Sequence, residues 1–528
     1  MNLARWTPWI GVGLLVATFS VSLLNITRRG REEADPGLRI LRIAHWQLEA
    51  GPSAAIDEIA REYERRHPGV RVEQLRIPER IYPQWVTTQL VGGTAPDLVQ
   101  VGTAIDNERL ARFFEPVTEH ALAPNPYNEG TELAGLPWRE TFYDGMASGF
   151  DENLQDYYGA AMFVGSVRMF YNRDLLVRIT GADAPPRTLA EYEALCRRVR
   201  EYAVETGRDL VPVAGSRYNA PMMVETQFRA VTQKLALTVA PRLVLRSEPE
   251  HVLLGFVEGT LGFATPEVRA GLDVMRRTGR TMQPGFTQLQ REDASILFQQ
   301  GHALMIATGS WDATGMFAND AFRVGAFELP MPMPDDPEFG GFVLGRTAEV
   351  GASAFNPFGI TRSSPNLELA LEFMRFMTSQ EQNRVFARVS GWLPMVKGVE
   401  PREQMKVFMP RYEGYPQGFG LGLGADTRRI LGSSLNQLYQ ASGTVEAFVG
   451  AVEKPYLEAA RADLGRILQA RLGQAVRSDY VSTANAIRVR RHPEDELLAR
   501  RVVAQRERLF DNELAHAFYL SRLEQAGP

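Results

Sequence analysis

Hydrophobic and polar positions along the chain predict strands that alternate with helices. The segment LRIAHW, which begins at Leu38, has the apolar pattern of a buried strand. Apolar residues then recur at helical spacing from Ile56 to Tyr63, until the residues HPG end the pattern. Ser53 is the predicted N-cap of this helix. The region therefore predicts one strand–helix unit.

The same alternation continues along the chain. VRVEQLRI predicts a second strand, WVTTQLVGG a helix that ends at Gly92 and Gly93, and DLVQVG a third strand. This order is typical of a parallel, doubly wound sheet. A similar alternation after Tyr171 predicts a second α/β unit. LELALEFMRFMTSQEQNRVFARV predicts one long amphipathic helix, and the polar chain beyond Ser442 also reads as helical.

Length and composition restrict the class of protein. A chain of 528 residues is too long for one ordinary domain and suggests two large lobes with additions. Apolar residues make up 45% and charged residues 23%, as in a folded globular protein. The net charge of -5 argues against a nucleic-acid partner. Cys196, the single cysteine, excludes an intrachain disulfide and is predicted to be buried.

The N-terminus has the properties of a membrane segment. No charged residue occurs from Trp6 to Thr27, a length that can cross a bilayer as one helix. The run lacks a small-residue cleavage pattern, so an uncleaved signal anchor followed by a linker is expected over residues 1–37, with a cleaved signal peptide as the alternative. The positive-inside rule favours the opposite orientation, because more arginines follow the run than precede it: Arg28, Arg29 and Arg31 against Arg5.

Motifs of catalysis are absent from the sequence. It contains no G-x-S-x-G, H-E-x-x-H, Walker A or C-x-x-C pattern. The seven histidines lack the spacing of metal ligands, and the glycine-rich segment GFGLGLG predicts a flexible loop. We therefore expect no metal, no cofactor and no catalytic residues.

Several short segments together resemble a known family. In chain order they are LRIAHW, HPGVRVE, GGTAPDLVQVG, MFYNRDLL, GHALMIATGSWD and GITRSSPNLELALEFMRFMTSQEQNRVFARVSGWLP. This set, between about residues 38 and 400, resembles the extracellular solute-binding proteins of bacterial ABC importers, in the class that includes maltose-binding protein. The sequence departs from the family in lacking a lipobox and the usual proline near AAMFVG, and in the additional residues 476–528.

The resemblance implies an α/β, periplasmic-binding-protein-like fold of two discontinuous, doubly wound lobes that close about a hinge. The crossing strands of the hinge are expected near Phe163–Arg168, Glu328–Pro332 and Trp392–Val396. With the N-terminal membrane helix and a helical C-terminal extension, the expected division is an anchor and linker over 1–37, a first lobe over 38–163 and 331–394, a second lobe over 164–330 and 395–475, and an extension over 476–528.

Candidate ligand-binding residues follow the predicted strands, because ligands of open α/β sheets bind at the carboxyl ends of strands. Aromatic faces cover the C–H faces of a sugar, and amides and carboxylates bind its hydroxyls. In the family, the tryptophan equivalent to Trp311 commonly faces the cleft. Glu49 has a second interpretation as a helix-entry charge, and each aromatic candidate, including Trp311, has one as a core residue. The candidates are Trp46, Gln47, Glu49, Gly102, Thr103, Tyr218, Trp311, Asp312, Phe355 and Phe358.

Other conspicuous residues are assigned to structure. Asp97 is expected to fix a turn, and Asn172 and Asp174 to cap a helix. Trp85 and the methionines Met374 and Met377 have the helical spacing of core residues.

The expected function is that of an ABC-importer subunit that binds a carbohydrate and delivers it to the permease subunits. It would act in the periplasm or cell envelope, anchored to the inner membrane. Two alternatives remain: a carbohydrate-active hydrolase that pairs Glu49 with Asp312, and a periplasmic ligand-sensor subunit.

Overall fold

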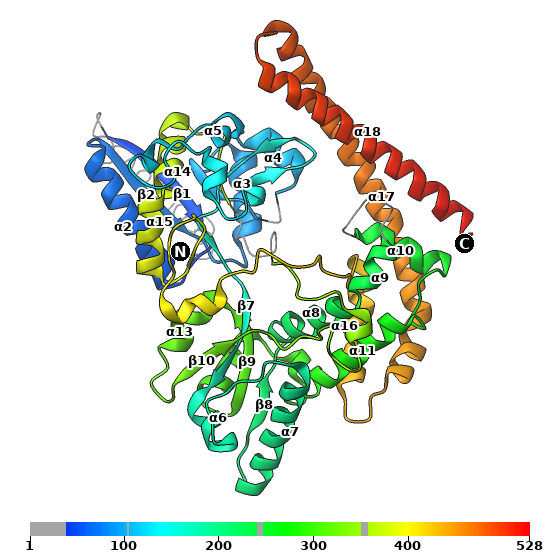
Figure 1. The fold of residues 1–528 in the computed structure, drawn as a ribbon. Helices are drawn as coiled ribbons and strands as arrows, with labels where there is room; N and C mark the ends of the chain where they lie inside the picture. The colour runs from blue at the N-terminus through cyan, green and yellow to red at the C-terminus, as the bar shows by residue number, and fades with distance from the viewer. Residues whose placement is uncertain (1–37, 103–104, 240–246, 350–356, 528) are drawn as a thin grey trace, which may run out of the picture.

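The computed structural model describes residues 38–102, 105–239, 247–349 and 357–527. Its centre consists of two four-stranded sheets, each with helices on its faces, which form a first and a second lobe (Figure 1). The predicted signal anchor over residues 1–37 lies outside the described residues. Among the residues that are described, no helix has the length and apolar character needed to cross a membrane.

The first lobe contains the sheet of order β11-β3-β1-β2. The strands β1 and β2 are parallel, as predicted, and so are β1 and β3, but β11 runs antiparallel to β3. The strands are β1 (Arg39–His45), β2 (Val70–Arg76), β3 (Leu98–Gln100) and β11 (Phe358–Ile360). The helices are α2 (Ala50–Arg66), α3 (Tyr82–Gly92), α4 (Asn107–Phe113), α5 (Thr118–Leu122), α14 (Leu367–Met377) and α15 (Gln380–Ser390).

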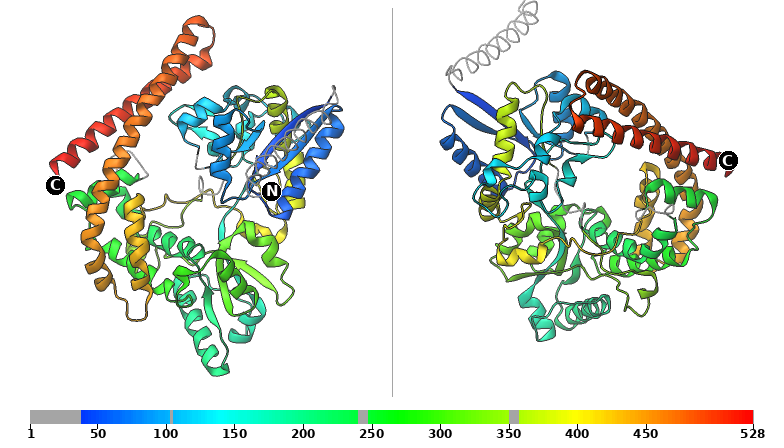
Figure 2. Two further views of the ribbon diagram at one scale, coloured as in Figure 1. Left: turned by 180° about the vertical axis from the view of Figure 1, so that it is seen from behind. Right: turned by 45° about the horizontal axis from the view of Figure 1, so that its top comes forward.

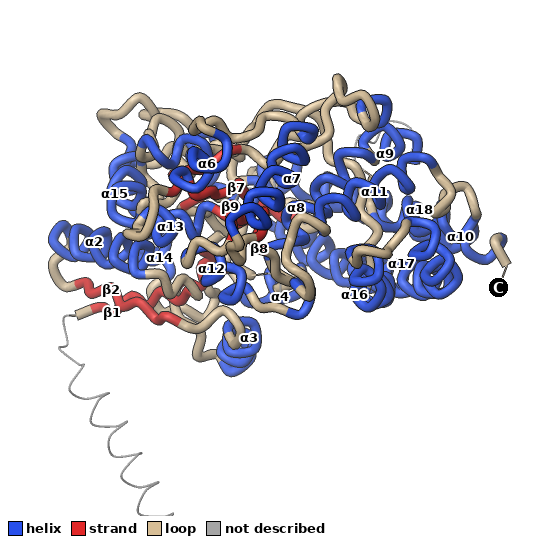
Figure 3. Tube along the Cα trace, turned by 90° about the horizontal axis from the view of Figure 1, so that it is seen from below, coloured by secondary structure: helices blue, strands red, loops and turns tan. Residues whose placement is uncertain are grey.

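The second lobe contains the sheet of order β10-β7-β9-β8, in which only β8 and β9 are parallel. Its strands are β7 (Val167–Asn172), β8 (Val211–Ala214), β9 (Ala303–Gly309) and β10 (Val324–Phe327). Its helices are α6 (Arg173–Thr180), α7 (Leu189–Thr206), α8 (Asn219–Val231), α9 (Gln233–Val239), α10 (Pro249–Glu258), α11 (Pro266–Gly279), α12 (Arg291–Gln299), α13 (Ala313–Phe317) and α16 (Ala425–Tyr439). Seen from below, α6, α7, α8, α12 and α13 lie around β7, β8 and β9, whereas α9, α10, α11 and α16 lie to one side of them (Figure 3).

The expectation of wholly parallel, doubly wound sheets was wrong in both lobes. A strand–helix–strand unit within one sheet produces parallel neighbours, but a strand that arrives from the other lobe has no such constraint. This is the case for β7 and β11, each of which is antiparallel to a strand beside it.

Two of the three predicted crossing segments meet as a small antiparallel sheet between the lobes. In it, β6 (Phe163–Val164) pairs with β12 (Leu393–Pro394). Trp392 packs edge-on against Phe163, with ring centroids 4.9 Å apart, so this connection is well packed. A further short hairpin, β4 (Phe150–Asp151) and β5 (Asp156–Tyr157), lies on the first lobe.

Local signals explain most element boundaries, with two exceptions. Asn172 caps α6 as predicted, because its Oδ1 accepts from the Leu175 amide at 2.9 Å. Ser53 does not cap α2; the N-cap is Glu49 and the Ser53 hydroxyl donates to the Gln47 carbonyl. The single long helix predicted after Asn366 is two helices, because Ser379 begins α15 by accepting from the Gln382 amide.

The remaining structural assignments hold except for that of Asp174, and Trp85 is only half-buried against the core. Asp97 accepts hydrogen bonds from the Arg42 amide and the Ser364 hydroxyl, so it holds the turn before β3. Asp174 does not cap α6 through its side chain but accepts from the Arg323 amide and guanidinium. Met374, Met377 and Cys196 are buried.

The C-terminal chain forms a long helical hairpin of α17 (Val445–Arg491) and α18 (Glu496–Gln525). It starts beside α10 and α16 of the second lobe and extends to the level of the first lobe (Figures 1 and 2). The predicted helical extension is confirmed, but its expected start at residue 476 falls inside α17, which is continuous.

Candidate functional site

A cavity of about 150 Å³ lies between the lobes beside the crossing strands. Its walls come from three parts of the fold. The first lobe contributes the loops that follow β1 and β2. The second lobe contributes the segments that follow β8 and β9 and the start of α12. The last wall residue, Trp392, directly precedes β12. The lining residues are Trp46, Gln47, Glu49, Glu79, Tyr218, Arg291, Trp311 and Trp392.

Trp46 is the aromatic wall of the first lobe. It follows β1 directly and packs edge-on against Tyr82, with ring centroids 4.9 Å apart. A Cβ placed on Gly102 would lie 3.6 Å from the indole. Gly102 therefore supports the Trp46 ring from behind rather than forming the wall itself.

Gln47 is held in place by hydrogen bonds at the sheet edge. Its amide donates to His45 Nδ1 at 3.2 Å, and its side-chain nitrogen donates to Gln100 Oε1 at 3.3 Å. Burial lowers the pKa of His45, so the imidazole is neutral. Because Nδ1 accepts, Nε2 carries the proton and donates to Gln74 Oε1 at 2.8 Å. Gln47 is thus a fixed wall residue.

Trp311 is the aromatic wall of the second lobe, in the short turn after β9. The indole lies over Gly309, where any Cβ would overlap the ring. The glycine in ATGSWD therefore lets the ring fold back across the strand end. Trp311 is half-buried, with one side packed against the hydrophobic core and the rest in the cavity wall.

Asp312 lies behind the cavity and orients the cation in its wall. It forms an ion pair with Arg291 and accepts from the Thr308 hydroxyl at 2.6 Å. The Arg291 guanidinium lies 5.1 Å from the centroid of the Tyr218 ring, in a cation–π contact. Burial opposes the charge of Arg291, but the Asp312 carboxylate and the Tyr218 hydroxyl keep its pKa raised.

The electrostatics of the wall favour a neutral ligand. Glu49 and Glu79 line the cavity, and the one cation among the lining residues, Arg291, is already paired with Asp312. Glu49 is exposed as a residue, but its carboxyl lies in the cavity wall. Desolvation there raises the pKa of the carboxyl, and the charge of Arg291 opposes this shift. An anionic solute would meet net negative charge here.

The structure brings together five of the predicted site residues as lining residues, namely Trp46, Gln47, Glu49, Tyr218 and Trp311. Asp312 and Gly102 lie directly behind the wall. The prediction for Phe358 was wrong: it begins β11, all of whose residues are buried, and it packs in the core without lining the cavity. Thr103 and Phe355 lie outside the described residues.

Three lining residues were not predicted. Trp392 had been assigned only to a crossing strand, although a bulky aromatic next to a hinge between lobes is a usable signal. Glu79 follows β2, so the strand-end rule would have found it. Arg291 begins a helix, and no local pattern marks it. Within the described part of the chain, no group of His, Cys, Asp and Glu side chains is arranged to hold a metal ion.

Comparisons with known proteins agree with this geometry. The family model for bacterial extracellular solute-binding proteins matches residues 58–411, more than half of the chain. A binding protein of Brucella abortus (strain 2308) is 23% identical over 407 residues, which are 75% of this chain and 83% of the relative.

Solved structures show the same fold. RafE, a solute-binding protein in complex with raffinose, has a TM-score of 0.54 at 16% identity, covering 80% of this chain and all of RafE. The GacH receptor of Streptomyces glaucescens, studied with and without acarbose, has a TM-score of 0.55 at 14% identity, covering 80% of this chain and 98% of GacH. These likenesses establish a periplasmic-binding-protein-like fold.

Proposed function

Because the chain belongs to the family of bacterial extracellular solute-binding proteins, we propose that it binds a neutral carbohydrate in the cavity between its lobes and delivers it to the permease subunits of an ABC importer. One observation carries the proposal. Three tryptophans and a tyrosine line one cavity together with an amide and carboxylates, and they come from both lobes and the hinge.

This set of side chains suits the surface of a sugar. Indole and phenol rings cover C–H faces, and their quadrupoles attract the weakly positive C–H groups. The carboxylates of Glu49 and Glu79 accept hydrogen bonds from hydroxyl groups, and Arg291 donates. The excess of carboxylates at the wall disfavours phosphorylated or carboxylated ligands, which supports a neutral solute.

The ligands of structurally similar proteins support the same class of solute. RafE was solved with raffinose and GacH with acarbose. Both ligands are oligosaccharides or their analogues, and this chain shares the fold that holds them.

The small volume of the cavity favours a movement of the lobes on binding. The cavity holds about 150 Å³ and opens to solvent, whereas ligand sites commonly have roughly 300–1,000 Å³. A ligand larger than one sugar ring extends beyond this volume, and a closer arrangement of the lobes would bring further side chains against it. Rotation about β6 and β12 provides it, as in other hinge-closing proteins.

The N-terminal residues bear on the cellular location of the protein. The family acts outside the cytoplasm, and the uncharged run from Trp6 to Thr27 has the length of a membrane-spanning helix. We propose that residues 1–37 anchor the protein to the inner membrane, with the lobes in the periplasm.

Hydrolysis is the alternative chemistry, and the contacts of Asp312 argue against the Glu49–Asp312 pair expected for it. A glycosidase needs two carboxyl groups that are free to act at the glycosidic bond. One oxygen of Asp312 is paired with Arg291 and the other accepts from Thr308, so neither is available. A sensor role remains compatible with binding and would differ only in the downstream partner.

A thermal-shift screen tests the proposal. The fragment beginning at Leu38 would be heated with raffinose, maltodextrins or chitooligosaccharides, and separately with carboxylated or phosphorylated derivatives of these sugars. A neutral oligosaccharide at 100 times its dissociation constant stabilises the folded state by about 2.7 kcal/mol and raises the melting temperature. A response to acidic sugars alone would contradict the proposed site.

A further inference from the structure

The C-terminal hairpin contacts both lobes, and its base is built into the second lobe. Tyr456, Leu464 and Leu468 of α17 and Tyr519 of α18 are buried in the core cluster of that lobe. At the same level, Arg471 forms an ion pair with Glu250 of α10. The base is therefore a permanent part of the second lobe.

The upper half of the hairpin docks on the first lobe. Arg501 of α18 forms an ion pair with Asp156 of β5 at 3.0 Å, with side-chain exposures of 8% and 4%. Beside it, the Gln505 side chain donates to the Leu154 carbonyl. Val481 of α17 packs against the same part of the lobe. These contacts join segments about 350 positions apart in the chain.

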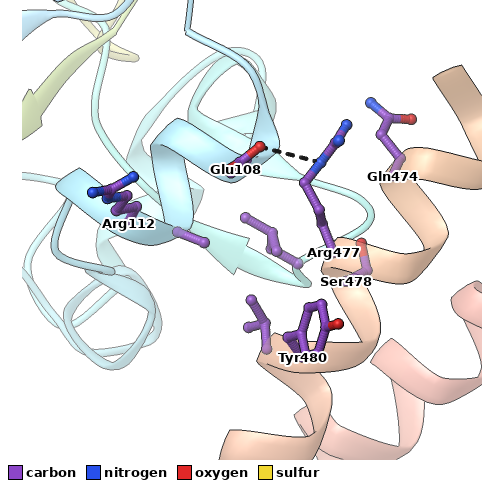
Figure 4. Close-up of a pocket in the computed structure, with 9 residues that line it drawn as sticks. Glu108, Arg112, Gln474, Arg477, Ser478 and Tyr480 are labelled. Carbon is purple, nitrogen blue, oxygen red and sulfur yellow. Dashed lines mark ion pairs between the residues drawn. The ribbon is translucent and has the colours of Figure 1, made fainter. Parts of the chain in front are cut away.

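A second set of contacts at this seam is also polar. The Asn512 amide donates to Asn153 Oδ1 at 3.0 Å, and Arg508 forms an ion pair with Glu152 at 2.9 Å. Arg477 of α17 reaches Glu108 of α4 at 3.5 Å, as Figure 4 shows.

The seam is incompletely packed, which distinguishes it from the base. A cavity of about 250 Å³ separates α4 from α17, where Tyr480 is 72% exposed (Figure 4). This groove is open to solvent, so α4 and α17 are not packed against each other along it and little apolar packing is lost there when they separate.

The hairpin is long and stiff enough to transmit a rotation of the lobes. Its 47-residue helix α17 is about 70 Å long at 1.5 Å per residue. The family match ends at residue 411, so both helices lie outside it. The hairpin therefore links the lobes in addition to the chain segments that cross between them, which include the crossing strands β6 and β12.

We infer that the α17–α18 hairpin is a latch that holds the two lobes in the arrangement seen here, and that its docking on residues 152–156 must break for the lobes to rotate about the hinge. A hinge rotation moves β5 relative to the second lobe, while the base of the hairpin stays with that lobe. The Arg501–Asp156 contact cannot survive a large rotation. The latch therefore sets the population of the rotated state before any ligand binds.

The test measures the distance between the lobes in the ligand-free protein. Val91 and Val204 are 70% and 84% exposed on α3 and α7, one in each lobe, and the native Cys196 is buried. Spin labels at Val91→Cys and Val204→Cys would report a distance distribution by pulsed electron resonance. In this background, Arg501→Gln is expected to broaden or shift the distribution.

A second variant and a control complete the design. Arg508→Ala removes only the exposed ion pair with Glu152 and should give a smaller shift, even if Arg501→Gln fails to fold. Arg500→Ala breaks an exposed pair with Glu496 within α18 and should leave the distance unchanged. Distributions identical to that of the unaltered protein in the folded latch variants would overturn the inference. No ligand is added, so the outcome is independent of which solute binds.

Discussion

Removing the Trp311 side chain would show whether this residue contributes mainly to ligand binding or to packing of the core. The indole is half-buried: it covers Gly309 on one side and lines the cavity on the other. Truncating a fully buried tryptophan costs roughly 3–5 kcal/mol of folding free energy. Because part of this ring faces the cavity, Trp311→Ala should cost on the order of 1–2 kcal/mol, or a few degrees in melting temperature.

The effect on ligand affinity should be larger than the effect on stability. Loss of an aromatic hot-spot contact costs about 2 kcal/mol or more, which is roughly a thirtyfold loss of affinity. Calorimetric titration and differential scanning calorimetry on the same preparation give both numbers.

Trp85→Ala is the matched control, since Trp85 is also half-buried but does not line the cavity. It should lower the melting temperature and leave the affinity within about threefold. An unchanged affinity for Trp311→Ala, together with a stability loss, would refute the assignment of Trp311 to the site.

Three further predictions follow from other parts of the molecule. Glu49→Gln should weaken binding of a neutral sugar about tenfold, because a charged acceptor is lost, while the melting temperature changes little; equal affinity would remove Glu49 from the site. Burial raises the pKa of Asp156 to about 6, although Arg501 opposes this shift. Folding therefore favours the protonated carboxyl, so this residue's contribution to stability is full below about pH 4 and is lost as the pH rises through 6. Calorimetry should therefore show the melting temperature of Asp156→Asn rising relative to wild type from pH 4 to 7. Deleting residues 1–37 should leave a soluble, folded protein, and N-terminal sequencing of the full chain from membranes should begin upstream of Thr27.

Most of the site residues that the sequence predicted correctly lie just after the ends of strands. Trp46 and Trp311 each follow a strand with a clear apolar pattern, so a general rule on open α/β sheets was enough to select them. Tyr218 was found in the same way, after β8. Phe358 failed the same rule because it stands within its strand, and burial cannot be read from residue type alone.

Long-range contacts explain what the sequence could not predict. Arg291 reaches the cavity only because Asp312, twenty-one positions away, and the Tyr218 ring hold its guanidinium. The antiparallel directions of β7 and β11 follow from their entry from the other lobe, which local periodicity does not record. Likewise, Arg501 has no local feature that predicts its pairing with Asp156.

Carbohydrate binding without turnover is decided by isothermal titration calorimetry of the fragment beginning at Leu38 with the neutral oligosaccharide that stabilises it most. We expect saturable binding at one site per chain, with the sugar recovered unchanged by chromatography after prolonged incubation. Consumption of the sugar, or no measurable binding across the whole neutral panel, would contradict it.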